Sequence, residues 1–95
     1  MSRGEEDGAA TAFLEEVGKT LTERAGSYPP YSIEASKVAQ VWNALHPGAG
    51  LGVEDVALFM MIVKLVRLSA GNSPDSLTDL VGYAARLRGM ECKAS

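Results

Sequence analysis

The chain has 95 residues, of which 46% are hydrophobic and 22% are charged, and its formal net charge is −3. These proportions are typical of one globular domain with a modest core. The acidic balance argues against a general nucleic-acid binder, which usually carries a basic excess, so no DNA partner is expected.

No targeting or membrane segment is expected. Residues 1–12 are acidic and contain no apolar run, so they do not resemble a signal peptide. The longest apolar run, residues 56–63, is far shorter than the ~20 residues needed to cross a bilayer. Cys92 is the only cysteine, which rules out a disulfide within the chain. The sequence therefore predicts a cytoplasmic protein with no membrane partner.

Four predicted helices organise the chain into one domain. Apolar residues recur at helical spacing in four segments, and no alternation typical of a strand has useful length. The predicted helices span residues 9–25, 32–45, 53–70 and 74–89. They form a single domain, 9–89, with flexible polar ends at residues 1–8 and 90–95.

The second helix follows a break and carries the one tryptophan. Pro29 and Pro30 lack amide hydrogens and separate this helix from the first. Trp42 and Leu45 share its apolar face. Trp42 is the largest candidate for the core, and the alternative is a surface on which a base stacks. His46, the only histidine, has no partner at ligand spacing and is assigned no role.

The third helix is the most apolar part of the chain and the basis for expecting a dimer. Between Asp55 and Arg67 it is apolar except for Lys64. A helix that is apolar nearly all round must be covered on several sides, which a domain of 95 residues does not provide alone. The expected fold is therefore a compact, all-α, four-helix bundle-like domain that is completed by a homodimer or a higher homo-oligomer.

Four charged residues are predicted to meet across the third and fourth helices. Lys64 and Arg67 are three apart and share one helix face. Asp75 and Asp79 are four apart on the next helix, on a stripe that Tyr83 and Arg86 continue. A short turn makes these helices antiparallel neighbours. Counting outward from the turn brings Lys64 level with Asp79, and Arg67 level with Asp75 or Ser76.

Two interpretations of these charges stay open. In the first, they are structural ion pairs that hold the two helices together. In the second, they line a ligand site. There, Lys64 and Arg67 hold phosphate oxygens, because both side chains donate charged hydrogen bonds. Asp75 and Asp79 hold Mg²⁺, which prefers oxygen ligands, and Tyr83 stacks or donates a hydrogen bond.

The same segments carry two longer patterns, ALxMxxxKxxRL at residues 57–68 and DSxxDxxGY at residues 75–83. Upstream lie Arg24, Tyr28 with a proline two positions later, and Trp42. In this combination the chain resembles a family of small, mostly bacteriophage-encoded domains of unknown function. A phage origin would place the protein in the cytoplasm of the bacterial host.

That family is similar to the MazG-like all-α nucleotide pyrophosphatases, oligomeric helical bundles that cleave nucleoside triphosphates with Mg²⁺. The resemblance implies a nucleotide or related phosphorylated ligand, and Mg²⁺ as the cofactor. It implies ligand contacts from Arg24, Tyr28, Trp42, Lys64, Arg67 and Tyr83, and metal ligands at Asp75 and Asp79.

The activity itself has three interpretations. If the protein is an enzyme, the resemblance implies a metal-dependent nucleoside triphosphate pyrophosphohydrolase. The ExxE pair with which those enzymes hold their metal is absent here, which favours a non-catalytic protein that sequesters a host nucleotide signal. The third interpretation is a protein-interaction module with a purely structural salt-bridge network.

Overall fold

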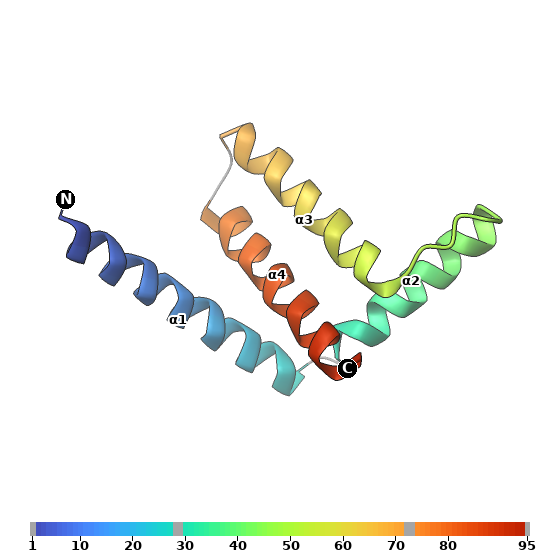
Figure 1. Ribbon diagram of the computed structural model, residues 1–95, viewed down its shortest axis with the longest axis horizontal. Helices are drawn as coiled ribbons and strands as arrows, with labels where there is room; N and C mark the ends of the chain where they lie inside the picture. Colours follow the sequence, from blue (N-terminus) through green and yellow to red (C-terminus); the bar gives the residue numbers. More distant parts are fainter. Residues whose placement is uncertain (1, 28–29, 72–73, 95) are drawn as a thin grey trace.

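The computed structural model describes residues 2–27, 30–71 and 74–94, apart from the side chains of residue 74 and residues 91–94. The described residues form four α-helices and no strand, which confirms the predicted all-α class. None of these helices is both long and apolar enough to span a membrane. The helices are α1 (Arg3–Ser27), α2 (Tyr31–Leu45), α3 (Val53–Ser69) and α4 (Pro74–Ala94) (Figure 1).

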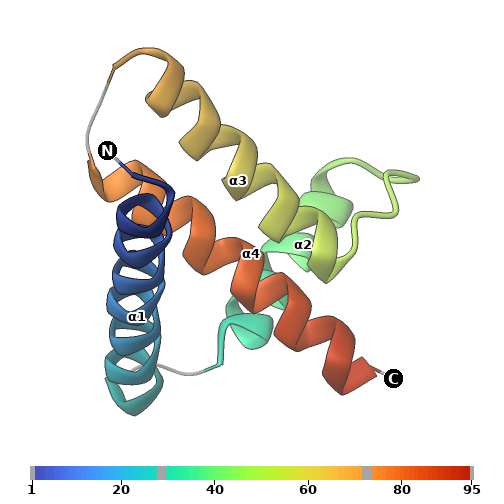
Figure 2. The ribbon, with the colours of Figure 1, turned by 60° about the vertical axis from the view of Figure 1, so that its left-hand side comes forward.

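An antiparallel pair, α3 and α4, forms the centre of the molecule. These two helices make the most extensive contact in the chain, while α2 packs on α3 and α1 packs on α4. In Figures 1 and 2, α4 lies between α1 and α3, so α4 contacts one helix on each side. This order places side chains from three helices around one stretch of α4.

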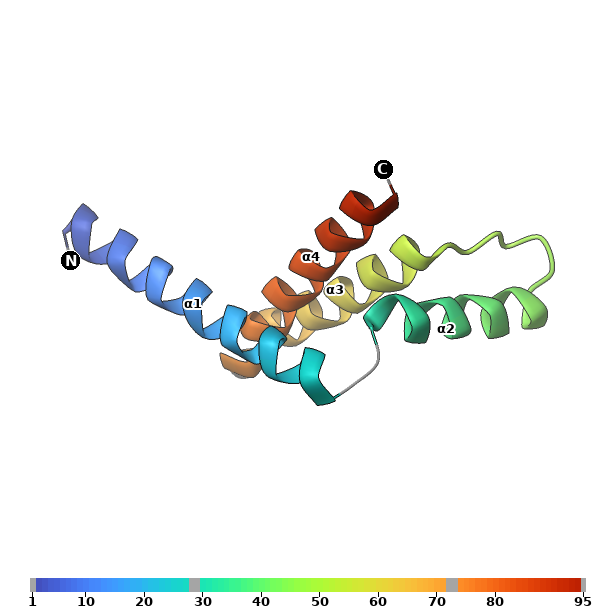
Figure 3. The same cartoon turned by 90° about the horizontal axis from the view of Figure 1, so that it is seen from below.

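The four helices are splayed rather than closed into a bundle. The chain measures 52 × 31 × 25 Å, with a radius of gyration of 15.6 Å. A compact domain of this length has a radius of gyration of about 12 Å. Seen from below, α1 and α2 extend away from the central pair in opposite directions (Figure 3). The expected compact bundle is therefore not formed by a single chain.

Both terminal helices are longer than the sequence predicts. The hydroxyl of Ser2 accepts a hydrogen bond from the Glu5 amide at 3.3 Å, and the Ser2 amide donates to the Glu5 carboxylate at 3.4 Å. This reciprocal capping box starts α1 at Arg3 rather than at residue 9. At the other end, α4 continues to Ala94 rather than ending at residue 89. The predicted helix bounds were wrong there, while the flexibility of the ends stays a prediction.

The core of the single chain is small. No large apolar side chain among the described residues is fully buried. The buried apolar side chains there are the small ones of Val17, Ala35, Ala39, Val56 and Ala57. Trp42, the largest core candidate from the sequence, is 47% exposed, so that prediction is wrong for the single chain. Its ring stacks on His46, with ring centroids 4.3 Å apart. The histidine without a predicted role thus shields one face of the indole.

The connection between α2 and α3 is fixed by one side chain. The Asn43 amide nitrogen donates to the Leu51 carbonyl at 2.9 Å, and the Asn43 amide oxygen accepts from the Leu51 amide at 2.8 Å. Gly48 and Gly50 adopt positive φ angles of 88° and 62°, which fold the connection back toward α2. This clamp sets the position at which α3 begins.

Replacing Asn43 with alanine is expected to destabilise the protein by about 1–2 kcal/mol, because two partly buried backbone groups lose their partner. Urea denaturation at a fixed protein concentration measures this change. Gln40→Ala is the matched control, since Gln40 is exposed and lies on the same helix; its effect should stay within about 0.5 kcal/mol. Equal effects of the two substitutions would contradict the role of the clamp.

Candidate functional site

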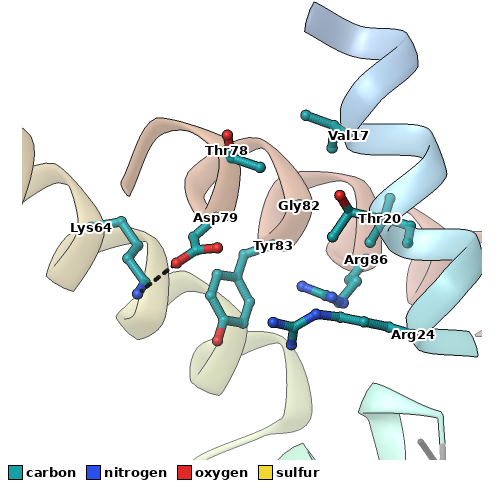
Figure 4. Close-up of a pocket in the computed structure, with 10 residues that line it drawn as sticks. Val17, Thr20, Arg24, Lys64, Thr78, Asp79, Gly82, Tyr83 and Arg86 are labelled. Atoms are coloured by element: carbon teal, nitrogen blue, oxygen red, sulfur yellow. Dashed lines mark ion pairs between the residues drawn. The ribbon is translucent and has the colours of Figure 1, made fainter. Parts of the chain in front are cut away.

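A cleft of about 210 Å³ opens where α1, α3 and α4 meet (Figure 4). The α4 side contributes one stripe of side chains, because residues three and four apart share a helix face. Its lining residues are Val17, Thr20, Leu21 and Arg24 from α1, Lys64 from α3, and Thr78, Asp79, Gly82, Tyr83 and Arg86 from α4.

One wall of the cleft is an ion pair. The Nζ atom of Lys64 lies 3.0 Å from Oδ2 of Asp79, as the register of the two helices predicts. The side chain of Lys64 is only 11% exposed, whereas that of Asp79 is 41% exposed. A buried ammonium group needs a partner, so Asp79 is required to hold Lys64 between the helices.

The second predicted pairing, between Arg67 and Asp75, is not found. Both residues are exposed, neither lines the cleft, and the described part of the chain contains no ion pair between them. Three residues turn a helix by about 300°, so Arg67 lies about 60° around α3 from Lys64 and reaches solvent. The prediction that two cations face two carboxylates was therefore right for one pair and wrong for the other.

The opposite wall is built from arginine and tyrosine side chains. The Arg86 guanidinium carbon lies 5.3 Å from the centre of the Tyr83 ring and 5.7 Å from that of Tyr31. The two rings meet edge to face, 5.4 Å apart. These cation–π contacts fix the direction of Arg86. Figure 4 shows Arg24 reaching from α1 into the same space beside Tyr83.

Gly82 lies under the guanidinium group of Arg86. A Cβ atom built at Gly82 would lie 3.4 Å from Nη1 of Arg86, which is an ordinary van der Waals contact. The position of Arg86 therefore does not require a glycine here.

The cleft is positively charged in a chain whose formal net charge is −3. Arg24, Lys64 and Arg86 line it together with a single carboxylate, that of Asp79. Among the residues that the structure describes, no ion pair involves Arg24 or Arg86. Two guanidinium groups beside each other repel, and an anion between them would relieve this repulsion.

A wider groove of about 800 Å³ continues from the cleft along α1, α2 and α4. The two hollows share four lining residues, Leu21, Arg24, Tyr83 and Arg86. The groove adds Tyr31, Lys37 and Glu34 from α2. A ligand could therefore place an anionic group in the cleft and a larger, flat group in the groove.

Burial raises the pKa of the Tyr31 phenol, and the neighbouring Tyr83 and Glu34 raise it further, while Arg86 lowers it. The phenol is therefore neutral at physiological pH and can donate a hydrogen bond into the groove.

Because the folded pKa of Tyr31 is raised, its contribution to stability is complete below the ordinary value of 10.0 and is lost as the pH rises through the folded pKa. Carbon-13 NMR of the Tyr31 Cζ atom should show ionisation above pH 10.0. Arg86→Gln should move this ionisation to still higher pH, since Arg86 is the group that lowers the pKa. Ionisation at or below the ordinary value would contradict the described packing.

The structure brings together half of the residues that the sequence singles out. Arg24, Lys64, Asp79 and Tyr83 line the cleft. Trp42 lies in a separate apolar groove of about 330 Å³ between α2 and α3, which borders the other side of Tyr83. Arg67 and Asp75 lie outside the cleft, and Tyr28 lies outside the described residues.

The sequence predictions gave no ligand role to three polar residues of the site, Arg86, Thr20 and Tyr31. The stripe of Asp79 and Tyr83 on α4 includes Arg86, which follows them by seven and three positions, but Arg86 was not assigned a ligand contact. For Thr20 and Tyr31 the sequence carries no signal, since only the packing of α1 and α2 brings them to α4.

The carboxylates near the cleft do not form a built Mg²⁺ site. The one carboxylate that lines the cleft, Asp79, is engaged by Lys64, and Asp75 lies outside the lining. In the described part of the chain, no three His, Cys, Asp or Glu side chains are placed to hold an ion. This donor set does not fit the cofactor that the resemblance implies. The prediction of Mg²⁺ rests on the resemblance alone. The positive charge of the cleft is that of the side chains of Arg24, Lys64 and Arg86.

The chain belongs to the family described as domain of unknown function DUF6378, whose model matches residues 12–91. The match covers all the residues that line the cleft. It confirms the predicted membership of a family of unknown function.

A phage protein is among the relatives. The chain is 31% identical over 70 residues to the Gene 55 protein of Mycobacterium phage L5. The match covers 73% of this chain but only 45% of the relative, so the chain spans about half the length of that protein. The predicted association with bacteriophages is thereby supported. No solved structure shows a significant match.

Proposed function

We propose that the protein binds a nucleotide or a related phosphorylated small molecule, with its phosphate groups held between Arg24 and Arg86. The observation that carries the proposal is the meeting of these two arginines at one cleft, without a carboxylate partner in the described residues. Guanidinium groups bind phosphate through two parallel hydrogen bonds, which gives both affinity and orientation. Because the formal net charge of the whole chain is −3, the excess of cations in the cleft is a local feature and not part of a generally basic surface.

The adjoining groove favours a nucleotide over a bare phosphate ion. Pockets for small organic ligands have volumes of about 300–1,000 Å³, and the groove of about 800 Å³ lies in this range. Tyr31 and Tyr83 offer aromatic surface there, and stacking of a base on an aromatic ring contributes about 1–3 kcal/mol. The phosphates would lie in the cleft and the base beside the tyrosines.

Two versions of the proposal differ in whether the nucleotide is hydrolysed. In the first version the protein hydrolyses a nucleoside triphosphate with Mg²⁺, as the resemblance of the sequence to the MazG-like enzymes implies. The geometry favours binding without turnover, because Asp79 is paired with Lys64 and Asp75 lies outside the cleft. A phage protein of this second kind would sequester a nucleotide signal of its host.

The proposal is tested by calorimetry with inorganic phosphate, a nucleoside, and the nucleoside mono-, di- and triphosphates of each base. We expect a phosphorylated nucleoside to bind more tightly than either inorganic phosphate or the nucleoside alone. Affinity should fall as salt is raised, because part of the binding is between charges. If none of these compounds binds, the proposal fails.

Release of pyrophosphate then separates the two versions. Protein that binds a nucleoside triphosphate is incubated with it and Mg²⁺ or Mn²⁺. The binding-only version predicts no pyrophosphate above a protein-free control. Multiple turnover would instead establish the enzyme, and Asp79→Asn should then abolish it.

A further inference from the structure

The outer face of α3 is apolar and uncovered. Its large side chains are 46–63% exposed, although Val56, Ala57 and Lys64 on the opposite face are buried. Successive residues of a helix are about 100° apart, which places the exposed side chains within about 120° of one another. They are Leu58, Phe59, Ile62, Leu65 and Val66.

This face continues onto α2. Val41, Trp42 and Leu45 are 59%, 47% and 70% exposed. The apolar groove of about 330 Å³ between the two helices is lined by Trp42 and Phe59, among others, and connects the two surfaces. Exposed apolar patches on monomers rarely exceed a few hundred Å², and larger ones mark interaction sites.

The chain exposes more surface than a monomer of its size. Its accessible surface is 6888 Å², whereas a compact monomer of 10.0 kDa exposes about 5,200 Å². The excess of roughly 1,700 Å² is larger than the ~800 Å² that each partner buries in a stable protein interface. Sufficient area is therefore available for a partner to cover the outer face of α3.

We infer that a second copy of the chain covers this face, with the two α3 helices antiparallel about a two-fold axis at Ile62. A two-fold interface brings the same patch of both copies together. Because the five exposed side chains of this face are uncharged, the face can pair with itself without repulsion between like charges. The antiparallel register sets Leu58 against Val66 of the second copy, and Phe59 against Leu65 of the second copy.

The charges at the start of α3 select the antiparallel direction. Asp55 lies at the N-terminal end of the same face and is exposed. A parallel pair would place the two Asp55 carboxylates together, whereas the antiparallel pair places Asp55 near Ser69 of the second copy. Antiparallel helices also oppose their dipoles favourably. The cleft lies on the α4 side of α3, so this interface leaves it open.

Disulfide cross-linking tests both the partner and the direction. In a Cys92→Ser background, Ile62→Cys places the new thiol on the proposed axis, and mild oxidation should give covalent dimers at micromolar protein. Ser69→Cys is the matched control at the end of the same helix, and should stay uncross-linked because its two copies lie about 20 Å apart. A mixture of Asp55→Cys and Ser69→Cys chains should form the mixed dimer. Cross-linking of Ser69→Cys, or none at Ile62→Cys, would overturn the proposal.

Light scattering supplies an independent readout without oxidation. The wild-type chain should have the mass of a dimer, and Ile62→Glu should halve it while the helical circular dichroism is retained. Leu14→Glu alters an equally exposed residue on α1 and should leave the mass unchanged. A wild-type monomer at tens of micromolar would refute the interface, whether or not the cleft binds a nucleotide.

Discussion

Replacing Arg86 with alanine is expected to weaken binding of a phosphorylated nucleoside by about 10- to 100-fold, since a hydrogen bond to a charged group contributes about 1.5–3 kcal/mol. Arg24→Ala should have an effect of similar size. Arg86→Lys keeps the charge but loses the two parallel donors, so it should restore only part of the affinity. Calorimetry at constant ionic strength measures all three variants.

Arg67→Ala is the informative control for this prediction. From the sequence alone, Arg67 is a phosphate ligand, whereas the structure places it in solvent outside the cleft. The cleft geometry predicts less than about a threefold change for Arg67→Ala, the size expected when only a distant screened charge is lost. A large loss with Arg67→Ala and none with Arg86→Ala would show that the ligand lies elsewhere.

Asp79→Ala is expected to lower the free energy of unfolding by about 1–3 kcal/mol. The ammonium group of Lys64 is almost buried, and it would lose the carboxylate 3.0 Å away. Removing one partner of a fully buried pair costs about 3–5 kcal/mol, but Asp79 is 41% exposed, so water reduces the loss. In a domain of this size, each kcal/mol lowers the melting temperature by roughly 4–8 °C.

The reverse substitution should be much milder. Lys64→Met removes the buried charge and leaves Asp79 partly in water, so the expected loss is below about 1 kcal/mol. The double variant Lys64→Met/Asp79→Leu should fold nearly as well as the wild type, because an apolar pair can replace an ion pair. Urea denaturation of the four proteins at one concentration measures this asymmetry. A double variant less stable than Asp79→Ala would contradict the account of the pair.

The register of the central helix pair could be predicted because it depends on local rules. Counting residues outward from a short turn is sufficient to place Lys64 opposite Asp79. The same count failed for Arg67, since it gives the height along the helix but not the direction around it. The start of α1 was missed for a different reason. The Ser2–Glu5 capping box that starts the helix lies within a polar, glycine-containing segment, whose composition predicts a flexible end rather than a helix.

The cleft could be predicted only in part because three helices build it. Stripe spacing on α4 gives Asp79, Tyr83 and Arg86 from the sequence alone. The contributions of Arg24 to the cleft and of Tyr31 to the adjoining groove depend on how α1 and α2 pack on α4, which no local pattern specifies. Trp42 illustrates the opposite failure. An apolar stripe shows that a residue must be covered, but does not show whether its own chain or a second copy covers it.

The most direct test of the proposed binding site is a side-chain NMR titration with the nucleoside phosphate that binds most tightly in calorimetry. The Nε–Hε signals of Arg24 and Arg86 should shift with the ligand and saturate at the same concentration, while the Arg67 signal stays in place. Ring signals of Tyr31 and Tyr83 should shift in parallel. Saturating binding that leaves both Arg24 and Arg86 unchanged would contradict the assignment of the cleft as the phosphate site.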